Sequence, residues 1–352
     1  MLKPKILLLH NHDNSWTPQA LIEAEQNRQL VLEALHKFGY EVMDVKVYDS
    51  VTEALCPRQL DPREWIVFNW CEGYADRPWD YDGVTEELDR LGYHYTGAAT
   101  WSHRVSADKG RVQAVLRAGR VPIPRGRVLQ PADDLDWALF PAIVKPINQH
   151  GSYGIDRQAV VLDRQQLRQR LEYVMERYRA PALVEEFIDG REFQVSVWGN
   201  RPVDVLPEVE LVFGNSLSWE ERIYTCEMKF DHDGPLHFNA GFVCPSMLTP
   251  QLRAKIGRGC RAAYRAMRCR DYARIDLRVR GQRVYVVDVN PNPDINCEAL
   301  LVIAASVVGL SYEEVVARIT EFAVERWRVT QPPAKMKRSQ QHEQPALVSK
   351  HI

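Results

Sequence analysis

The stretch ARIDLRVRGQRVYVVDVNPNPDIN, residues 273–296, predicts two β-strands that form a hairpin and end in an acidic loop with two prolines. Apolar and charged residues alternate along the first strand, so Asp276 lies on its charged face. Asp288 and Asn290 share one face of the second strand. A three-residue hairpin loop would place Asp276 directly opposite Asp288, whereas a two-residue loop would place it opposite Val287.

This strand end has two interpretations. Two carboxylates and an amide oxygen are the hard oxygen ligands that Mg²⁺ takes, with water and phosphate oxygens completing its octahedron. The prolines at 291 and 293 would stop the strand ladder and hold the ligand loop rigid. The alternative is a solvated strand face on which Arg274, Arg278 and Arg283 pair with the aspartates. Spacing alone leaves both interpretations open.

A second segment carries groups suited to phosphate. Lys145 ends a short apolar strand, and the polar turn that follows contains Gly151, Ser152 and Gly154. Backbone N–H groups in such a turn can approach a polyphosphate. The turn does not match G-x-x-x-x-G-K-[ST], which excludes a Walker-type P-loop.

The N-terminal part of the chain predicts a parallel sheet. Strand 6–9, helix 22–38 and the alternating segment 40–48 form a β-α-β unit, which the apolar strand 65–69 extends. Residues 1–100 therefore predict a doubly wound α/β domain, whose functional loops follow the carboxyl ends of its strands.

The rest of the chain predicts two further units and a tail. Residues 101–190 form a small α+β module, which begins with a helix at 106–119. Strands 182–190 and 192–199, joined by a glycine loop across the C-terminal boundary of this unit and backed by helix 163–178, are grouped with it. Residues 191–330 form a C-terminal α+β domain with three helices, at 250–268, 298–308 and 311–326. The polar, basic segment 331–352 is expected to be a disordered tail.

Composition excludes several classes of protein. The chain has 352 residues, of which 45% are apolar and 26% charged, and its formal net charge is −2. This charge, without a long basic block, argues against nucleic-acid and membrane partners. Seven cysteines without C-x-x-C or zinc-site spacing indicate free thiols in a reducing compartment. Only four consecutive apolar residues stand near the N-terminus, too few for a signal peptide, so a cytoplasmic protein is expected.

Four segments together resemble the ATP-grasp ligases, and within them the D-alanine–D-alanine ligase family. They are YTGAATWSHRVSADK (95–109), FPAIVKPINQHGSYGI (140–155), LVEEFIDGREFQVSV (183–197) and the hairpin with its loop (273–296). The resemblance implies an ATP-grasp fold made of the three units above. It also implies an enzyme that uses ATP and Mg²⁺ to join a carboxylate to an amine through an acyl phosphate, and it allows a homodimer.

The resemblance assigns roles to individual residues. Asp276, Asp288 and Asn290 would hold two Mg²⁺ ions, for which Mn²⁺ could substitute. Arg274 would stabilise the acyl phosphate, and Lys229 would reach the terminal phosphate from a mobile lid within 213–230. The residues expected to bind ATP are Lys109, Lys145, Gly151, Ser152, Gly154, Glu185, Glu186, Phe187, Ile188 and Glu192, with 185–188 at the adenine and Glu192 at the ribose.

The likeness is weakest where the amino-acid substrates would bind. HNHDNSWTPQALIEAEQ (10–26) replaces a glycine-rich stretch with a substrate-gripping glutamate, and Phe230 stands where the family's lid commonly ends in tyrosine. The glycine that follows the last metal ligands is also replaced, within NPNPDIN. These departures predict another substrate pair, with His12, Asn14 and Glu72 as candidate contacts because they follow strands of the first domain.

Alternatives to an amino-acid ligase remain. One is an ATP-binding module without turnover, and another is a ligase for a non-amino-acid or carrier-bound acid. Cys71 is not expected to be a nucleophile, because no base is fixed near it and a free cysteine usually packs in the interior.

Overall fold

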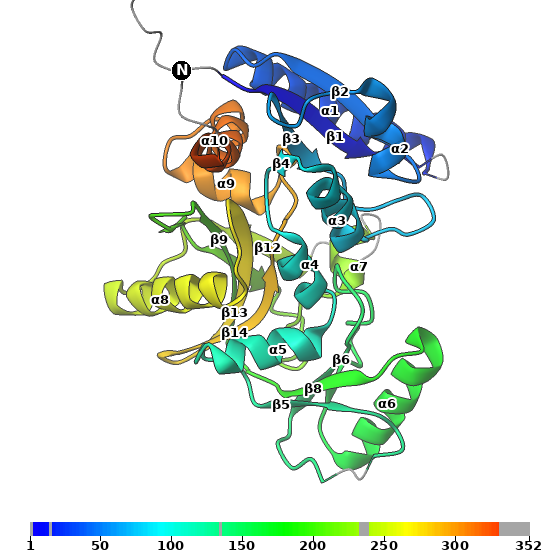
Figure 1. Cartoon of the computed structure of the whole chain (residues 1–352). Coiled ribbons are helices and arrows are strands. Elements are labelled where there is room, and N and C mark those ends of the chain that lie inside the picture. The colour runs from blue at the N-terminus through cyan, green and yellow to red at the C-terminus, as the bar shows by residue number, and fades with distance from the viewer. Residues whose placement is uncertain (1–2, 14–15, 134–135, 232–238, 331–352) are drawn as a thin grey trace, which may run out of the picture.

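Residues 3–13, 16–133, 136–231 and 239–330 are described by the computed structural model. The candidate substrate residue Asn14, the 331–352 tail and part of the 213–242 segment therefore lie outside the described residues. Figure 1 shows three sheets that follow one another through the molecule, with the N-terminal sheet and the central sheet at opposite ends.

The N-terminal sheet is parallel, with strand order β2-β1-β3-β4. Its strands are β1 (Lys5–Asn11), β2 (Val42–Val47), β3 (Trp65–Trp70) and β4 (His94–Tyr95). Ile6 and Leu8 of β1 pack in one core, which also contains residues of α1 (Pro18–Lys37) and α10 (Tyr312–Thr330). Leu7 and Leu9 pack in another, with α2 (Val51–Leu55) and α3 (Tyr81–Leu91). Helices thus cover both faces, which confirms the doubly wound domain.

The C-terminal helix α10 completes the N-terminal domain. It packs against α1, β3 and β4, as Figure 1 shows. The buried Asp271 reinforces this junction: it accepts hydrogen bonds from the Gly97 backbone N–H at 2.8 Å and from Asn200 at 3.0 Å, and it pairs with Arg326 of α10. The two ends of the chain therefore build one structural unit.

The central sheet is antiparallel, with strand order β5-β8-β6-β7. It consists of β5 (Gly126–Leu129), β6 (Ala142–Pro146), β7 (Val160–Val161) and β8 (Ala182–Glu186), and α6 (Arg164–Tyr178) packs on it. Two helices, α4 (Thr100–Ser106) and α5 (Lys109–Ala118), precede it where the sequence predicted one. Asp108 begins the second of them by accepting a hydrogen bond from Arg111 N at 3.0 Å.

The C-terminal sheet has the strand order β12-β11-β9-β13-β14, and β10 pairs with β9. Its strands are β9 (Arg191–Trp198), β10 (Asp204–Val205), β11 (Val209–Phe213), β12 (Ala240–Val243), β13 (Tyr272–Arg280) and β14 (Arg283–Asn290). The remaining helices of this part are α7 (Cys226–Phe230), α8 (Pro250–Ala266) and α9 (Leu300–Val307), and the short 3₁₀ helix η1 (Cys56–Arg58) lies in the first domain.

One expected grouping is wrong. Strands 182–190 and 192–199 were predicted to share a module, but β8 belongs to the central sheet and β9 pairs with β10, β11 and β13. The chain crosses between the sheets at Gly190, where a Cβ would lie 2.1 Å from the Val279 carbonyl oxygen. Only glycine permits this close approach of two backbones.

No single helix in the described ranges is long and apolar enough to cross a membrane. The helices α9 and α10 pass such a test only as a pair, by length and composition, and the chain bends by 105° between them. Many of their apolar side chains lie in the first core.

Candidate active site

The β13–β14 hairpin brings the two aspartates together by a route that the sequence did not predict. Arg280 pairs with Arg283, so the loop is the two-residue alternative, which by simple counting would have placed Asp276 opposite Val287. The register then shifts between Asp276 and Leu277, where Val287 is an extra residue on β14. This bulge restores the pairing of Asp276 with Asp288.

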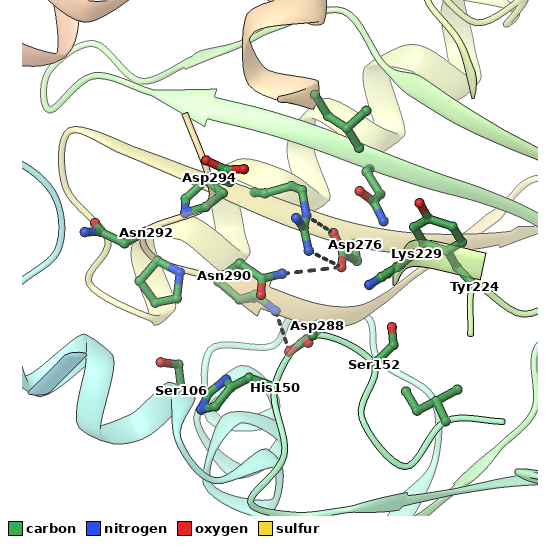
Figure 2. A pocket seen from close by; sticks show the side chains of 18 of the residues that line it. Ser106, His150, Ser152, Tyr224, Lys229, Asp276, Asp288, Asn290, Asn292 and Asp294 are labelled. Carbon is green, nitrogen blue, oxygen red and sulfur yellow. Dashed lines mark hydrogen bonds and ion pairs between the residues drawn. The ribbon is translucent and has the colours of Figure 1, made fainter. Parts of the chain in front are cut away.

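The three oxygen-bearing side chains at this strand end differ in their partners. Arg274 donates two hydrogen bonds to Asp276, at 2.8 and 3.1 Å, and Asn290 Nδ2 donates a third at 3.3 Å (Figure 2). Asp288 forms no ion pair with any described residue; its Oδ1 accepts a hydrogen bond from the Val289 N–H at 2.9 Å. The solvated-face alternative therefore holds in part, because Arg274 does pair with Asp276.

These donors fit a divalent ion of the Mg²⁺ type. Among the described residues, Asp288 offers a carboxylate without an ion-pair partner, and the amide oxygen of Asn290 accepts no hydrogen bond because its nitrogen faces Asp276. In the described ranges, no group of three or more His, Cys, Asp or Glu side chains could hold a metal by itself. An ion at this point would thus need further oxygens from water and phosphate, as Mg²⁺ usually does.

A buried ion pair lies beside this strand end. Lys145 Nζ contacts Glu185 Oε2 at 2.8 Å, and the two side chains are only 10% and 4% exposed. Gln113 donates to the other oxygen of Glu185 at 3.2 Å. Although burial lowers it, the Glu185 carboxylate raises the pKa of Lys145 above its usual value. Glu185, expected to act through its backbone, thus also holds Lys145 in its charged form.

Lys109 supplies a second cation at the same wall. It is the first residue of α5, and its ammonium donates to the Gln149 carbonyl of the polar turn. Burial lowers the pKa of Lys109, while the charge of Asp288 opposes that shift. The two lysines and Asp288 are therefore close enough to interact, as the resemblance implied.

Arg278 is a site residue that the sequence analysis placed only in a solvated ion pair. Its guanidinium donates to Glu192 at 2.5 Å, to the Ile188 carbonyl at 3.1 Å and to the Arg222 carbonyl. It also lies over the Phe187 ring, 4.8 Å from the ring centre. The alternation along β13 puts Arg274, Asp276 and Arg278 on one face, so the signal was present in the sequence.

The polar turn after β6 is fixed by residues in the left-handed region. Gly151, Ser152 and Gly154 have φ angles of 61°, 67° and 79°. Gly151 and Ser152 line the cavity described below, but Gly154 does not. A Cβ at Gly154 would lie 2.5 Å from Pro146 Cγ, so this glycine shapes the turn.

The segment 213–230, which was expected to be a lid, places a third lysine near Arg274 and Asp276. Thr225 caps α7 by accepting a hydrogen bond from Met228 N at 3.2 Å, and Lys229 lies in the last turn of this helix. The Lys229 ammonium is 4.8 Å from the centre of the Tyr224 ring. Burial and the nearby Arg274 lower the pKa of Lys229 to about 8.

Most of these groups line one cavity of about 790 Å³. Figure 2 shows Asp276, Asp288 and Asn290 on one wall, with His150 and Ser152 below and Lys229 and Tyr224 beside them. Two predicted site residues in the described ranges are outside its lining, Gly154 and His12. The predicted residues that line it are Glu72, Lys109, Lys145, Gly151, Ser152, Glu185, Glu186, Phe187, Ile188, Glu192, Lys229, Arg274, Asp276, Asp288 and Asn290.

His12 packs elsewhere. Its ring lies edge-on to Tyr48, with ring centres 5.3 Å apart, and its backbone N–H continues the pairing with β2 through Val47 O at 2.9 Å. The structure thus gives His12 a place at the end of the N-terminal sheet and brings His10 and Asn11 to the cavity instead.

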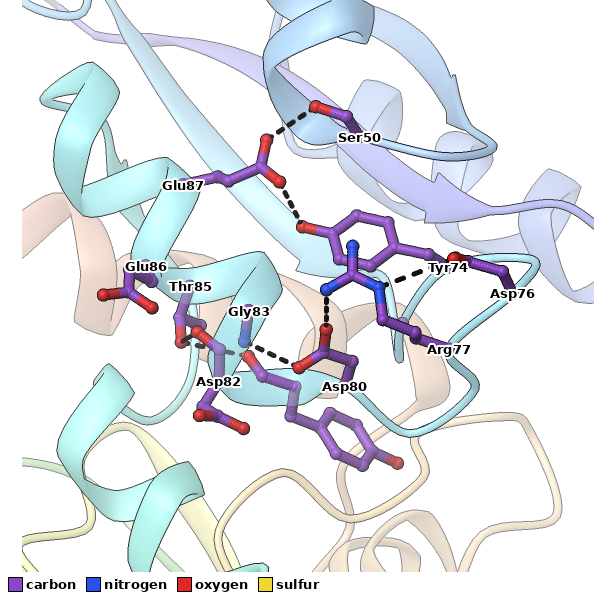
Figure 3. A network of polar contacts seen from close by, with 12 residues as sticks. Ser50, Tyr74, Asp76, Arg77, Asp80, Asp82, Gly83, Thr85, Glu86 and Glu87 are labelled. Carbon is purple, nitrogen blue, oxygen red and sulfur yellow. Dashed lines mark hydrogen bonds and ion pairs between the residues drawn. The ribbon is translucent and has the colours of Figure 1, made fainter.

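Glu72 reaches the cavity from a loop that polar contacts hold in shape. Tyr74 donates to Glu87 of α3 at 2.8 Å, and Glu87 also accepts from Ser50 at 2.8 Å (Figure 3). Arg77 pairs with Asp80 at 2.7 Å in the same network. The loop thereby keeps Glu72 at the cavity, where Tyr81 donates to its carboxylate at 3.2 Å.

Cys71 is inert at this position. The side chain is buried, and burial raises the pKa of its thiol to about 12. A thiol in this state is almost wholly protonated near neutral pH, which agrees with the expectation that Cys71 is not a nucleophile.

Comparisons with known proteins agree with this geometry. A sequence model of the family described as "D-ala D-ala ligase C-terminus" matches residues 128–321. The chain is 29% identical over 307 residues to the protein y4sG of Sinorhizobium fredii, which covers 84% of this chain and 87% of that protein. It is 28% identical to a D-alanine–D-alanine ligase of Desulforudis audaxviator, over 84% of this chain and 92% of that enzyme.

The fold has solved counterparts. The crystal structure of D-alanine–D-alanine ligase from Bacillus anthracis complexed with ATP superposes with a TM-score of 0.71. The match covers 94% of this chain and all of that chain, at 20% sequence identity. This likeness establishes the fold: a parallel N-terminal sheet followed by two antiparallel sheets.

Proposed function

This chain belongs to the D-alanine–D-alanine ligase family and is an ATP-grasp ligase, and from that premise we propose that it joins a carboxylic acid to an amine through an acyl phosphate. The observation that carries the proposal is the strand end of β13 and β14. There Asp276 and Asp288 face each other with Asn290, inside a cavity that also contains three lysines and Arg274.

The first step would be transfer of the terminal phosphoryl group of ATP to the acid. This chemistry needs positioning and charge neutralisation more than covalent help from the protein. Lys109 and Lys145 from one wall and Lys229 from the other would hold the phosphate oxygens. Asp276, Asp288 and Asn290 would hold Mg²⁺, which supplies charge neutralisation at the phosphates when bound.

In the second step the amine would displace phosphate from the acyl group. The carbonyl oxygen becomes negative as the amine adds, and a fixed cation stabilises that charge. Arg274 is suited to this role because Asp276 orients its guanidinium with two hydrogen bonds. Three of its five N–H groups remain for the acyl phosphate.

Exclusion of water would protect the acyl phosphate. Ile223, Tyr224 and Lys229 of the lid segment line the cavity, and Ile223 packs against Val160 of the central sheet. A lid that orders over bound ATP would close this side during the reaction. The segment's low periodicity in sequence and its short helix α7 support this assignment.

The altered N-terminal part supports a substrate pair other than two D-alanines. His10, Asn11 and Glu72 line the cavity in a domain that lies outside the matched residues 128–321. A ligase for a carrier-bound or non-amino-acid substrate remains within this proposal, because the nucleotide and metal residues would serve any carboxylate.

The test is phosphate release from Mg·ATP with a panel of single and paired L- and D-amino acids and small carboxylic acids. Release that requires both an acid and an amine is expected from the wild type. Asp288→Ala should lower it about 100-fold or more, because metal-assisted charge stabilisation contributes several kcal/mol to such transition states. Asp204→Ala, at an exposed aspartate of β10, is the matched control and should keep full activity.

The fold of Asp288→Ala should be intact, because Asp288 forms no ion pair with any described residue. Its melting temperature checks this. Wild-type release rates in Asp288→Ala would refute the metal assignment, and release that never depends on an amine would refute the ligase proposal.

A further inference from the structure

Arg278 lies where three parts of the molecule meet. It belongs to β13, lines the cavity and is only 6% exposed. Its Nη1 donates to the carbonyl of Ile188, which follows β8, at 3.1 Å. Its Nη2 donates to Glu192 Oε2 of β9 at 2.5 Å and to the carbonyl of Arg222, which belongs to the lid segment 213–230. One buried side chain thus contacts the end of β8, the start of β9 and the lid segment.

The pair of Arg278 and Glu192 fixes one carboxylate oxygen and leaves the other to a ligand. The two side chains are 7% and 12% exposed, so the carboxylate is held in a largely dry place. Among the described residues, none donates a hydrogen bond to Glu192 Oε1. Glu192 lines the cavity, and the family resemblance assigns it to the ribose. An arginine that binds Oε2 therefore orients Oε1 toward a ribose hydroxyl.

The lid segment rests on the same wall of the cavity. Ile223 packs with Phe187 in a small core that it shares with the central sheet. The Trp219 and Phe187 ring centres are 6.0 Å apart. The Arg278 guanidinium lies over that Phe187 ring, 4.8 Å from its centre, and bonds the lid backbone at Arg222. Arg278 and Phe187 together attach this part of the lid segment to the cavity wall.

The three contacts suit arginine and no other cation. Its planar guanidinium presents five N–H donors in fixed directions and keeps its charge at all ordinary pH values. Two of its nitrogens serve acceptors from different parts of the chain. A lysine has a single nitrogen, which cannot donate along both edges at once. A buried guanidinium is also costly unless it is paired, and one carboxylate with two carbonyls supplies the partners.

We propose that Arg278 is a positioning residue that joins the ribose contact to the lid. It orients the Glu192 carboxylate for the ribose hydroxyls of ATP, and it holds the lid backbone at Arg222. The proposal rests on the proposed function, because it concerns the nucleotide and the lid of that reaction. Lys229 follows on the same segment, so attachment at Arg222 also limits where its ammonium can lie. An arginine with a merely structural role would stabilise the sheet without affecting recognition of the ribose.

The binding arm compares Mg·ATP with the magnesium complexes of 2′-deoxy-ATP and 3′-deoxy-ATP by isothermal titration. The wild type should bind ATP at least about tenfold more tightly than one of these analogues, as expected for a hydroxyl bonded to a carboxylate. Arg278→Met should lose most of this preference, because the Glu192 carboxylate is no longer oriented.

Arg191→Met is the matched control of this arm. Arg191 also pairs with a glutamate, Glu210, at 2.6 Å, and it lies 5.0 Å from the centre of an aromatic ring, that of Phe193. It belongs to the same sheet but is outside the cavity lining. This variant should keep the full preference for ATP.

The lid arm measures hydrogen exchange of the backbone amides of 217–223 in the full chain without nucleotide. Arg278→Met should raise their exchange rates at least about tenfold, as expected for the loss of a hydrogen bond from a charged donor. The amides of β1 should keep their wild-type protection, which shows that the fold is intact. Arg278→Lys keeps a charge beside Glu192, so it should retain most of the ribose preference but show the faster exchange.

Two results would overturn the inference. One is a wild-type value of either the ribose preference or the lid exchange in a folded Arg278→Met, and the other is a wild type that binds both analogues as tightly as ATP. If Arg278→Met does not melt cooperatively, unchanged lid exchange in Arg278→Lys overturns the inference instead. Phosphate release that never depends on an acid and an amine would overturn the proposed function and leave the ribose preference as it is.

Discussion

The nucleotide side of the cavity and its acidic end are built in different ways. On the nucleotide side three ion pairs stand on or next to strands: Lys145 with Glu185, Arg278 with Glu192, and Arg274 with Asp276. At the acidic end, which consists of Glu72 and Asp294, both groups come from loops, and neither has a cationic partner in the part of the chain that the structure describes.

This difference follows the family match. Residues 128–321 contain most of the nucleotide side and also Asp294, whereas Glu72 of the acidic end and its neighbour Tyr81 lie before them. Strands fix a side chain through the pairing of the whole sheet, so a charged constellation on them is preserved together with the fold. Loops tolerate substitution at small cost to the fold, so substrate recognition can change there.

The largest expected effect tests the nucleotide side. Lys145→Met leaves the Glu185 carboxylate buried without its cation, which should lower the free energy of unfolding by about 3–5 kcal/mol and weaken ATP binding. The double variant Lys145→Met/Glu185→Gln should recover most of the stability but not the ATP affinity. Urea unfolding and ATP titration measure the two quantities.

The control for that pair is on the surface. Lys37 and Glu313 are 2.8 Å apart, but their side chains are 61% and 33% exposed. Lys37→Met should therefore change the stability by less than about 1 kcal/mol. If Lys145→Met bound ATP as tightly as the wild type, Lys145 would not contact phosphate. The contrast between the nucleotide side and the acidic end would then be refuted.

The next effect concerns pH and the lid. The pKa of Lys229 is lowered to about 8 by burial and by Arg274. Its ammonium therefore loses charge as the pH rises through 8, so ATP affinity should fall over the interval from about pH 7 to about pH 9. Lys229→Arg should remove this decline, because arginine stays protonated. Isothermal titration of ATP at several pH values measures it.

The direction of this pH dependence follows from the effect of bound ATP on the pKa of Lys229. ATP phosphates favour the charged form of Lys229, so its apparent pKa in the complex should be higher than in the free protein. An ATP affinity that is flat over this pH interval in the wild type would show that Lys229 does not contact phosphate.

The smallest effect tests the loop that carries Glu72. Tyr74→Phe removes the hydrogen bond to Glu87, which should lower stability by about 1 kcal/mol. It should raise the KM of the substrate held at the acidic end several-fold, with ATP affinity unchanged. Tyr93→Phe, which removes a hydrogen bond to the Leu60 carbonyl at 3.2 Å, is the matched control. Equal KM values in both variants would show that the loop does not position the substrate.

The pairing of the two aspartates shows how far the sequence could lead. Alternation along 273–279 and 284–290 was enough to put Asp276, Asp288 and Asn290 on one face. The bulge at Val287 could not be predicted, because it depends on packing around an edge strand. Val286 N–H donates to the Pro122 carbonyl at 2.8 Å, a contact between residues far apart in the chain.

The strand periodicity, the Lys145 turn and the order of the four segments were readable in the sequence alone. They determined the fold class and predicted the candidate nucleotide and metal residues. The tertiary structure decided which residues form the acidic end, since Glu72 and Asp294 come from separate segments of the chain. It also decided that Lys145 pairs with Glu185, that Arg278 pairs with Glu192, and that His12 lies outside the cavity lining. Local patterns report the direction of a side chain from its own strand or helix, but charge pairing and desolvation depend on neighbours that only folding brings within reach.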